Sequence, residues 1–328
     1  MSSFVDRFGR EHTDLRVSLT DKCNLRCTYC MPSEHMTWLP GPDLLTADEI
    51  VRVVAIACAN GVNTVRLTGG EPLLRADVVE IVGRIAALPS KPAIAMTTNG
   101  IRLAQHVDAL VSAGLQRLNI SLDTLDATRF VQLTRRNELH AVVSGIEAAI
   151  AAGIQPIKLN AVLMRGVNDD EAAILLNWAL ERGLQLRFIE EMPLNQTAGW
   201  SATGYVTAAE TIARLRESFE LHEMPIDPHS PARLMRIGDS DATVGFINSI
   251  SQPFCGGCDR MRLTADGQFR NCLFGRDEFE LRKLLREEAS DRDILQRMQD
   301  AIAQKKAGHG TDDLTLLSPN RGMHAIGG

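Results

Sequence analysis

Six of the seven cysteines fall into two groups of three. Cys23, Cys27 and Cys30 are spaced C-x3-C-x2-C, so that three thiolates within eight residues can surround one compact metal site. A structural zinc ion takes four protein ligands, and the nearest further candidate is His35. A redox pair at Cys27 and Cys30 would leave Cys23 without a role. An iron–sulfur cluster held by three thiolates, with one iron left open for a cofactor or substrate, accounts for all three cysteines.

The second group, Cys255, Cys258 and Cys272, has the spacing C-x2-C-x13-C. It also lacks a fourth cysteine, so a zinc site completed by His or Asp and a second iron–sulfur cluster with an open iron both fit. Arg260 and Arg262 lie inside this group and share one side if the segment is extended. Guanidinium groups suit bidentate phosphate binding, so the two arginines fit an anion site beside the second metal site, although lone arginines are usually solvated surface residues.

Six short strand-like segments alternate with helical segments in the first part of the chain. The predicted strands are Leu15–Thr20, Thr64–Thr68, Ala93–Thr97, Arg117–Asp123, Pro156–Met164 and Gln185–Glu190, and helices between them include Ala47–Asn60, Asp77–Leu88, Leu139–Ala152 and Asp170–Arg182. Repeated strand–helix–strand units predict a parallel sheet with right-handed crossovers. Six units are two short of a closed eight-stranded barrel, so an open barrel and a doubly wound sheet both fit the pattern.

The pattern changes after Met192. A helix at Ala208–Phe219 is followed by an antiparallel hairpin of Arg233–Ile237 and Thr243–Ile250, and then by helices near Phe279–Glu288 and Asp291–Lys305. The chain from Ala307 onward is predicted to be loop. The first cysteine group and Gly69-Gly70 each follow a predicted strand, at the sheet edge where parallel α/β folds place their chemistry.

Composition limits the class of protein. The 328 residues are 45% hydrophobic and 23% charged, as in ordinary globular proteins, and 35 basic against 41 acidic residues give a net charge of −6. This balance argues against non-specific nucleic-acid binding. No apolar run approaches the roughly 18 residues needed to span a bilayer, and no secretory signal is visible, so we expect a cytoplasmic protein without a membrane segment. Cys58 lies in the apolar segment VVAIACA and is predicted to be a core residue.

The motif C-x3-C-x2-C with Tyr29 before its last cysteine resembles the signature of radical S-adenosylmethionine (SAM) enzymes. Gly69-Gly70-Glu71-Pro72 resembles the glycine-rich motif of that family, in which absent Cβ atoms allow close backbone approach. With its two cysteine groups, nearly the whole chain resembles the GTP 3′,8-cyclase family, including DRFGR, LRVSLTDKCNLRCTYCMP, RLTGGEPLLR, TTNG, NISLD, KLNAVLMRGVND, RFIEEMP, CGGCDRMRLTADG and the Gly-Gly end.

The resemblance implies an α/β fold, an incomplete (β/α)6 barrel of the TIM type over residues 1–192. Residues 193–306 would form an α+β region carrying the second cluster, and residues 307–328 a flexible Gly-Gly tail. It also implies a lyase of molybdenum cofactor biosynthesis that holds two [4Fe-4S] clusters and SAM. In this family a 5′-deoxyadenosyl radical abstracts hydrogen from C3′ of GTP, and the C3′ radical attacks guanine C8 to give (8S)-3′,8-cyclo-7,8-dihydroguanosine 5′-triphosphate.

The resemblance also assigns roles to residues. Cys23, Cys27 and Cys30 would hold the first cluster, Cys255, Cys258 and Cys272 the second, and Tyr29, Gly70, Ser121 and Met192 would bind SAM. GTP would contact Arg16, Arg66, Lys158, Arg260, Met261, Arg262 and one of Thr97 or Thr98, with Thr97 preferred. Catalytic roles fall to Arg260, Arg262 and the C-terminal Gly327 and Gly328. Independently, Arg16, Arg66 and Lys158 lie within predicted strands, where a charge is costly unless it faces a polar site.

Partners follow from the same resemblance: GTP as substrate, the cyclic pyranopterin monophosphate synthase as the next enzyme of the pathway, and a homodimer, since family members often dimerise. The electron donor cannot be named from the sequence. Two alternatives remain open. One is a radical SAM enzyme that modifies peptides, although such enzymes carry more cysteines in their C-terminal regions. The other is a non-catalytic iron–sulfur sensor, which would need no triphosphate pocket.

Overall fold

A computed structural model describes residues 3–31, 33–194, 204–308 and 321–327. Within these residues one sheet of twelve strands runs through the molecule in the order β12-β11-β10-β1-β2-β3-β4-β5-β6-β9-β8-β7. The central strands are all parallel: β1 (Asp14–Ser18), β2 (Thr64–Thr68), β3 (Ala93–Thr98), β4 (Arg117–Ser121), β5 (Ile157–Val162) and β6 (Gln185–Ile189). These six strands confirm the predicted ones, with ends that differ by one or two residues.

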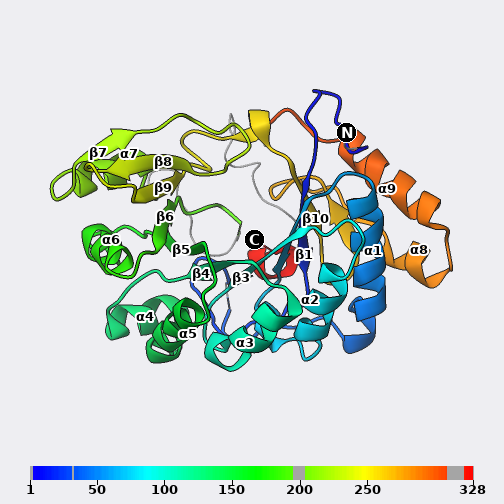
Figure 1. Ribbon diagram of the computed structural model, residues 1–328, viewed down its shortest axis with the longest axis horizontal. Coiled ribbons are helices and arrows are strands. Elements are labelled where there is room, and N and C mark those ends of the chain that lie inside the picture. The colour runs from blue at the N-terminus through cyan, green and yellow to red at the C-terminus, as the bar shows by residue number, and fades with distance from the viewer. Residues whose placement is uncertain (1–2, 32, 195–203, 309–320, 328) are drawn as a thin grey trace.

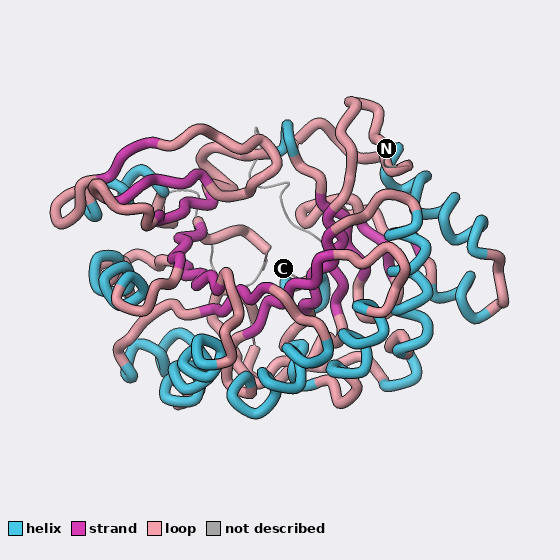
Figure 2. The backbone as a smooth tube through the Cα atoms, viewed as in Figure 1, coloured by secondary structure: helices cyan, strands magenta, loops and turns pink. Residues whose placement is uncertain are grey.

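Helices cover the outer face of the curved sheet, and the C-terminus lies on its inner side (Figure 1). The covering helices are α1 (Ala47–Ala59), α2 (Val78–Ala86), α3 (Leu103–Ala113), α4 (Ala127–Thr134), α5 (Leu139–Ala151) and α6 (Ala172–Leu180). Figure 2 shows the same strands as a curved band, with helices on the convex side. The architecture is therefore α/β with a mainly parallel sheet, as the alternating pattern predicted.

Local sequence explains where these helices begin and end. Thr46 and Glu49 form the predicted capping box of α1, with the Glu49 amide donating to Thr46 Oγ1 at 3.2 Å and the Thr46 amide donating to Glu49 Oε2 at 2.8 Å. Gly114 ends α3 at φ 109°, a left-handed backbone that glycine adopts without a steric penalty. The helices bury one apolar face against the strands, so the core lies between the two layers.

The C-terminal part adds strands to both ends of the parallel sheet. On one side, β7 (Leu221–Glu223), β8 (Arg233–Ile237) and β9 (Thr243–Ile247) follow α7 (Ala208–Leu215), and β8 and β9 form the predicted antiparallel hairpin. The last strand of that hairpin, β9, pairs in parallel with β6. On the other side, β10 (Arg260–Leu263) pairs in parallel with β1 and continues into β11 (Gln268–Arg270) and β12 (Phe279–Glu280).

Four elements of the C-terminal part differ from the sequence predictions. Strands β10 and β11 were not predicted, because β10 is extended by pairing with a strand from the opposite end of the chain. The predicted helix from Phe279 is shorter, α8 (Arg282–Arg286), since Phe279 instead pairs with Phe269. The predicted loop after Ala307 contains α10 (Met323–Ile326), whose Ile326 is buried against the inner side of the sheet.

The last long helix is α9 (Asp291–Ala303), which confirms the prediction and begins at a Ser290–Asp293 capping box. Across the described ranges, no helix combines the length and the apolar character that crossing a bilayer requires.

Candidate active site

Two neighbouring cavities lie inside the curve of the sheet, and each contains one group of cysteines. The first, of ≈210 Å³, is lined by Cys23, Cys27 and Cys30, and the second, of ≈370 Å³, by Cys255, Cys258 and Cys272. Five residues line both cavities, so the two spaces adjoin: Thr97, Asn160, Ile189, Met192 and Met323. The fold thus brings the two cysteine groups to one interior, from opposite ends of the chain.

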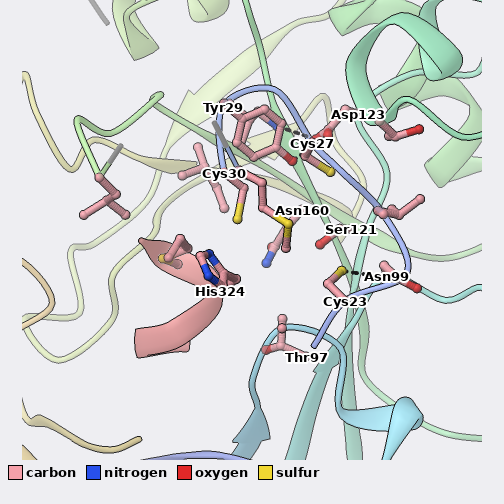
Figure 3. A pocket seen from close by; sticks show the side chains of 18 of the residues that line it. Cys23, Cys27, Tyr29, Cys30, Thr97, Asn99, Ser121, Asp123, Asn160 and His324 are labelled. Atoms are coloured by element: carbon pink, nitrogen blue, oxygen red, sulfur yellow. Dashed lines mark hydrogen bonds between the residues drawn. The ribbon is translucent and has the colours of Figure 1, made fainter. Parts of the chain in front are cut away.

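The first cysteine group lies in the loop that follows β1, and its neighbours come from the ends of β2 and β3 (Figure 3). Asn99 Nδ2 donates to Cys23 Sγ at 3.8 Å. Asn99 is itself held by Glu71, whose buried carboxylate accepts from the Asn99 amide and from Thr98 Oγ1, each at 2.7 Å. Burial raises the pKa of Glu71 to about 7, and these hydrogen bonds partly oppose that rise. Glu71 therefore joins the glycine-rich motif to the cysteine loop.

Gly69 and Gly70 allow the backbones of these two loops to touch. A Cβ on Gly69 would lie 2.4 Å from the Thr20 carbonyl oxygen, and one on Gly70 would lie 2.3 Å from that of Lys22. The Gly70 amide instead donates to the Thr20 carbonyl oxygen at 2.7 Å. Here the close approach is between two loops of the protein, and the approach to SAM that the family resemblance implies for the glycine pair stays a prediction.

All four predicted SAM-binding residues line the first cavity: Tyr29, Gly70, Ser121 and Met192. Tyr29 Oη donates to Asp123 Oδ2 at 2.7 Å, and the Val162 amide donates to Asp123 Oδ1 at 2.9 Å (Figure 3). Burial raises the pKa of Asp123 to about 6. Asp123 was not assigned a role from sequence, although its place at the end of a predicted strand was a usable signal.

The thiols of the first group are enclosed. Burial raises the pKa of Cys23 to about 11 and that of Cys30 to about 12. Such thiols become thiolates when a cation binds them, and three thiolates form the donor set of an iron–sulfur cluster. The donors therefore fit the expected group. All the cysteines have free thiols. In the described ranges no three His, Cys, Asp or Glu side chains lie close enough to bind one single metal ion, whereas a four-iron cluster binds each thiolate through a different iron atom.

The second cavity is lined by cations from five strands of the sheet. They are Arg16 on β1, Arg66 on β2, Lys158 on β5, Arg187 on β6, and Arg260 and Arg262 on β10. Arg16 pairs in register with Arg66 on one side and Arg262 on the other, so three guanidinium-bearing residues form one row. The buried Nε atoms of Arg16 and Arg66 have no hydrogen-bond partner. The arrangement confirms that the charged strand positions face a polar cavity.

Two of these cations have lowered pKa values, although Asp14 on the same cavity wall partly offsets the effect on Arg66. Burial and the charge of Arg16 lower the pKa of Arg66 to about 10. Burial, together with Arg187 and Arg66, lowers the pKa of Lys158 to about 8. An anion in the cavity would relieve both effects. Arg187 was missed from sequence, although its charge within a predicted strand is the signal that supported the assignment of Lys158.

The structure also separates Thr97 from Thr98. The Thr98 hydroxyl is buried and donates to Glu71, whereas Thr97 lines both cavities. Met261, expected at the substrate, is different: its side chain is 0% exposed in the core and does not line the cavity. Because side chains of a strand alternate, Arg260 and Arg262 face the cavity while Met261 faces the other way. The Met261 side chain is therefore directed away from the cavity, and the substrate role that the resemblance implies for this residue stays a prediction.

The end of the chain reaches the boundary between the two cavities. The Gly327 carbonyl oxygen accepts from Arg262 Nη1 at 2.5 Å, and the Ile326 carbonyl oxygen accepts from Ser18 Oγ at 3.1 Å. Met323 and His324 line the first cavity. Gly328, expected to share the role of Gly327, lies outside the described residues.

Arg260 has two further contacts in this interior. Its guanidinium carbon lies 4.6 Å from the centre of the Phe254 ring. Burial would raise the pKa of the Cys258 thiol, but the charges of Arg260 and Lys305 outweigh burial and lower it to about 7. The second cysteine group is therefore surrounded by positive charge.

Comparison with known proteins agrees with this geometry. Residues 17–179 match the family model "Radical SAM superfamily", and residues 184–311 match "Molybdenum Cofactor Synthesis C". The GTP 3′,8-cyclase of Streptomyces coelicolor is 51% identical over 99% of this chain and 96% of its own. The GTP 3′,8-cyclase of Corynebacterium glutamicum is 49% identical over 99% of this chain and 89% of its own.

Solved structures resemble the fold at low sequence identity. Streptococcus suis SuiB bound to S-adenosylmethionine gives a TM-score of 0.61 at 16% identity, over 90% of this chain and 68% of that chain. The protein anSMEcpe with bound AdoMet gives 0.59 at 12% identity, over 91% and 79%. These likenesses concern the fold, whereas the relatives of about 50% identity cover both cysteine groups and the cations between them. The chain belongs to the GTP 3′,8-cyclase family of the radical SAM superfamily.

Proposed function

We propose that this chain is a lyase that converts GTP to (8S)-3′,8-cyclo-7,8-dihydroguanosine 5′-triphosphate, the first step of molybdenum cofactor biosynthesis. The observation that carries the proposal is the row of buried cations between two cysteine groups in adjoining cavities. A triphosphate with about four negative charges is the kind of ligand that such a row stabilises, through charge-assisted hydrogen bonds. Neither a sensor nor a peptide modifier requires it.

The first cavity would hold a [4Fe-4S] cluster on Cys23, Cys27 and Cys30, with SAM between Tyr29, Gly70, Ser121 and Met192. Bound there, the cluster and SAM would supply the 5′-deoxyadenosyl radical that takes hydrogen from C3′ of GTP. The chain's own residues shape the site. Glu71 and Asn99 fix the cysteine loop, and Asp123 fixes the Tyr29 side chain.

The second cavity would hold another [4Fe-4S] cluster on Cys255, Cys258 and Cys272, and GTP between this cluster and the first cavity. Arg16, Arg66, Lys158, Arg260 and Arg262 would bind the substrate, with Thr97 at the boundary of the two cavities. We add Arg187 to this set, because it lines the same cavity and its pKa is lowered to about 10 by burial. Gly327 would position Arg262 toward the reacting atoms through its carbonyl oxygen.

The finer architecture belongs to the same proposal. We regard residues 1–192 as an incomplete (β/α)6 barrel, residues 193–306 as the region of the second cluster, and residues 307–328 as a tail that returns to the site. Six consecutive parallel strands and the position of Gly327 support this division. A homodimer and a cytoplasmic location rest on the family resemblance and on composition, and sedimentation equilibrium would test the dimer.

An anaerobic turnover assay tests the function. Reconstituted protein should hold about eight irons, four for each cluster. With SAM, GTP and a reductant it should form 5′-deoxyadenosine and the cyclised nucleotide. Replacing Cys23, Cys27 and Cys30 with Ala should halve the iron and abolish 5′-deoxyadenosine formation, whereas Cys58→Ala should change neither. Zinc in the second site, or 5′-deoxyadenosine formed with a peptide but not with GTP, would contradict the proposal.

A further inference from the structure

A series of hydrogen-bonded, buried polar side chains lies behind the second cysteine group, and the proposed reaction does not use it. It connects Asp6, His12 and Lys305 to Cys258. His12 is 0% exposed and Lys305 is 3% exposed, so both are removed from water. Buried polar groups are costly unless hydrogen-bonded, and a buried ammonium needs a compensating charge as well. The role of the Lys305 ammonium follows from the atoms that it contacts.

The contacts within this series show which atom donates and which accepts in each hydrogen bond. Asp6 Oδ2 lies 3.2 Å from His12 Nε2, and His12 Nδ1 lies 3.4 Å from Lys305 Nζ. Since a carboxylate only accepts, His12 Nε2 carries the proton and His12 Nδ1 accepts from the ammonium. Lys305 Nζ also donates to the Arg260 carbonyl oxygen at 2.8 Å and to Cys258 Sγ at 3.5 Å. The ammonium is therefore aimed at a cysteine sulfur.

Lys305 has no carboxylate among its partners. In the described part of the chain its contacts are an imidazole nitrogen, a carbonyl oxygen and the Cys258 sulfur, and it forms no ion pair with Asp or Glu. The sulfur is the one partner of the three that becomes an anion, which it does as a thiolate ligand of a metal. The buried charge of Lys305 is therefore matched when the second cluster is bound.

The N-terminal segment holds this arrangement in place. Arg10 Nη1 donates to the Cys255 carbonyl oxygen, and Arg10 Nη2 donates to that of Lys306, each at 2.6 Å. Arg10 Nε donates to Asp6 Oδ2 at 2.6 Å. One arginine thus joins the cysteine loop, the residue after Lys305 and the carboxylate that orients His12.

The first cysteine group has the opposite surroundings. Cys23 Sγ accepts a hydrogen bond from the neutral Asn99 side-chain amide. The negative charge of Glu71 disfavours the Cys23 thiolate, and that of Asp123 disfavours the Cys27 thiolate. No ammonium of the described ranges donates a hydrogen bond to these three sulfurs. The chain therefore places a cationic donor specifically on the second group.

We propose that Lys305 is a positioning residue that raises the reduction potential of the second cluster, by donating a hydrogen bond from its ammonium to the Cys258 sulfur. Taking up one electron makes a cluster more negative, and a fixed cation beside a ligand sulfur favours that state. Hydrogen bonds to sulfur are among the factors that set such potentials. The inference rests on the proposed function, which supplies the second cluster.

The test uses full-length protein with Cys23, Cys27 and Cys30 replaced by Ala, so that only the second cluster contributes. In this parent, Lys305→Met fills similar space without the charge, and replacing a buried charge with an apolar side chain is often tolerated. Lys305→Gln keeps a neutral donor. Redox titration followed by electron paramagnetic resonance should show a lower midpoint potential in Lys305→Met. We expect at least a tenfold change in the one-electron equilibrium, which corresponds to about 59 mV, and a smaller shift of the same sign in Lys305→Gln.

Lys306→Met is the matched control, because it removes the same charge from the neighbouring residue, whose side chain is exposed and screened by solvent and salt. Its potential should stay close to that of the parent. An unchanged potential in Lys305→Met, an equal shift in Lys306→Met, or loss of iron from both Lys305 variants would overturn the inference. A parent that binds no iron would instead show that the second cluster itself is wrong, and would overturn both proposals.

Discussion

Changing Gly327 to Ala should uncouple the end of the chain from the active site without unfolding the protein. Gly327 has φ 83°, a region that side chains rarely adopt. An added Cβ would lie 2.1 Å from Ser18 Oγ and 2.9 Å from Thr68 Cγ2. Ser18 cannot easily move away, since it is buried and its hydroxyl donates to the Ile326 carbonyl oxygen. The tail must therefore give way.

The size of the effect follows from two contributions. A non-glycine residue in such a backbone region costs about 1–3 kcal/mol. Losing the hydrogen bond from Arg262 to the Gly327 carbonyl oxygen costs about 1.5–3 kcal/mol, because the donor is charged. Together they would shift the equilibrium between docked and undocked tail by roughly 10² to 10⁴, at about 1.4 kcal/mol for each factor of ten. Formation of the cyclised nucleotide should fall accordingly.

The assay compares Gly327→Ala with Gly308→Ala, whose added Cβ would meet nothing within 4 Å. Both variants should keep the iron content, the unfolding temperature and SAM binding of the wild type. Hydrogen exchange should be faster only in Gly327→Ala, at the amides of α10 and of Gly327, which donates to the Met323 carbonyl oxygen. Wild-type product formation by Gly327→Ala, with the tail shown to be undocked, would refute the reasoning.

Three further changes probe other parts of the structure. Gly70→Ala should prevent binding of the first cluster and so remove about half of the iron, because the added Cβ would lie 2.3 Å from the Lys22 carbonyl oxygen and 2.5 Å from that of Asp21. The control Gly256→Ala, whose Cβ would meet nothing within 4 Å, should retain all the iron. Arg187→Met should weaken GTP binding by about 1.5–3 kcal/mol, measured by anaerobic calorimetry, at unchanged iron content. Wild-type affinity would remove Arg187 from the substrate site. Arg182→Met, which removes an arginine that pairs with Glu147 on the outer surface, is the control. Burial, aided by Lys305, lowers the pKa of His12 from 6.5 to about 4, so the unfolded chain binds a proton that the folded chain does not. Metal-free protein should therefore lose about 3 kcal/mol of stability as the pH falls from 6.5 to 4, a loss absent from His12→Gln and retained in the exposed-site control His222→Gln.

The sequence predicted best what depends on neighbours along the chain. Strand β2 lies at Thr64–Thr68 as expected, because a short apolar run between a helix stop and a glycine pair leaves little choice. Arg16, Arg66 and Lys158 were assigned by the family resemblance and supported by a physical conflict, a charge within a buried strand; the same conflict is present at Arg187.

Features that depend on distant partners were missed. Nothing around Arg260 indicates a parallel strand, because the strand exists only beside β1. The sequence placed Arg260 and Arg262 on one side only if their segment is extended, and the pairing with β1 supplies that condition. Likewise His12 and Lys305 look like ordinary polar residues until folding brings them together. The local pattern therefore defines the six-stranded unit, and tertiary contacts define the second cavity.

The pairing of β10 with β1 has a consequence for how the protein is made. Strand β1 is synthesised first, and its partner on one side, β2, follows soon afterwards, but its other partner is synthesised only after Arg260. Until then the second edge of β1 is unpaired in the growing chain, and Arg16 lies along that edge. Open edges pair readily with other chains, and charges on an edge discourage such pairing. Arg16 is thus suited to protect the nascent chain from aggregation before it serves the finished cavity, and slow translation before β10 should increase the protein's dependence on chaperones.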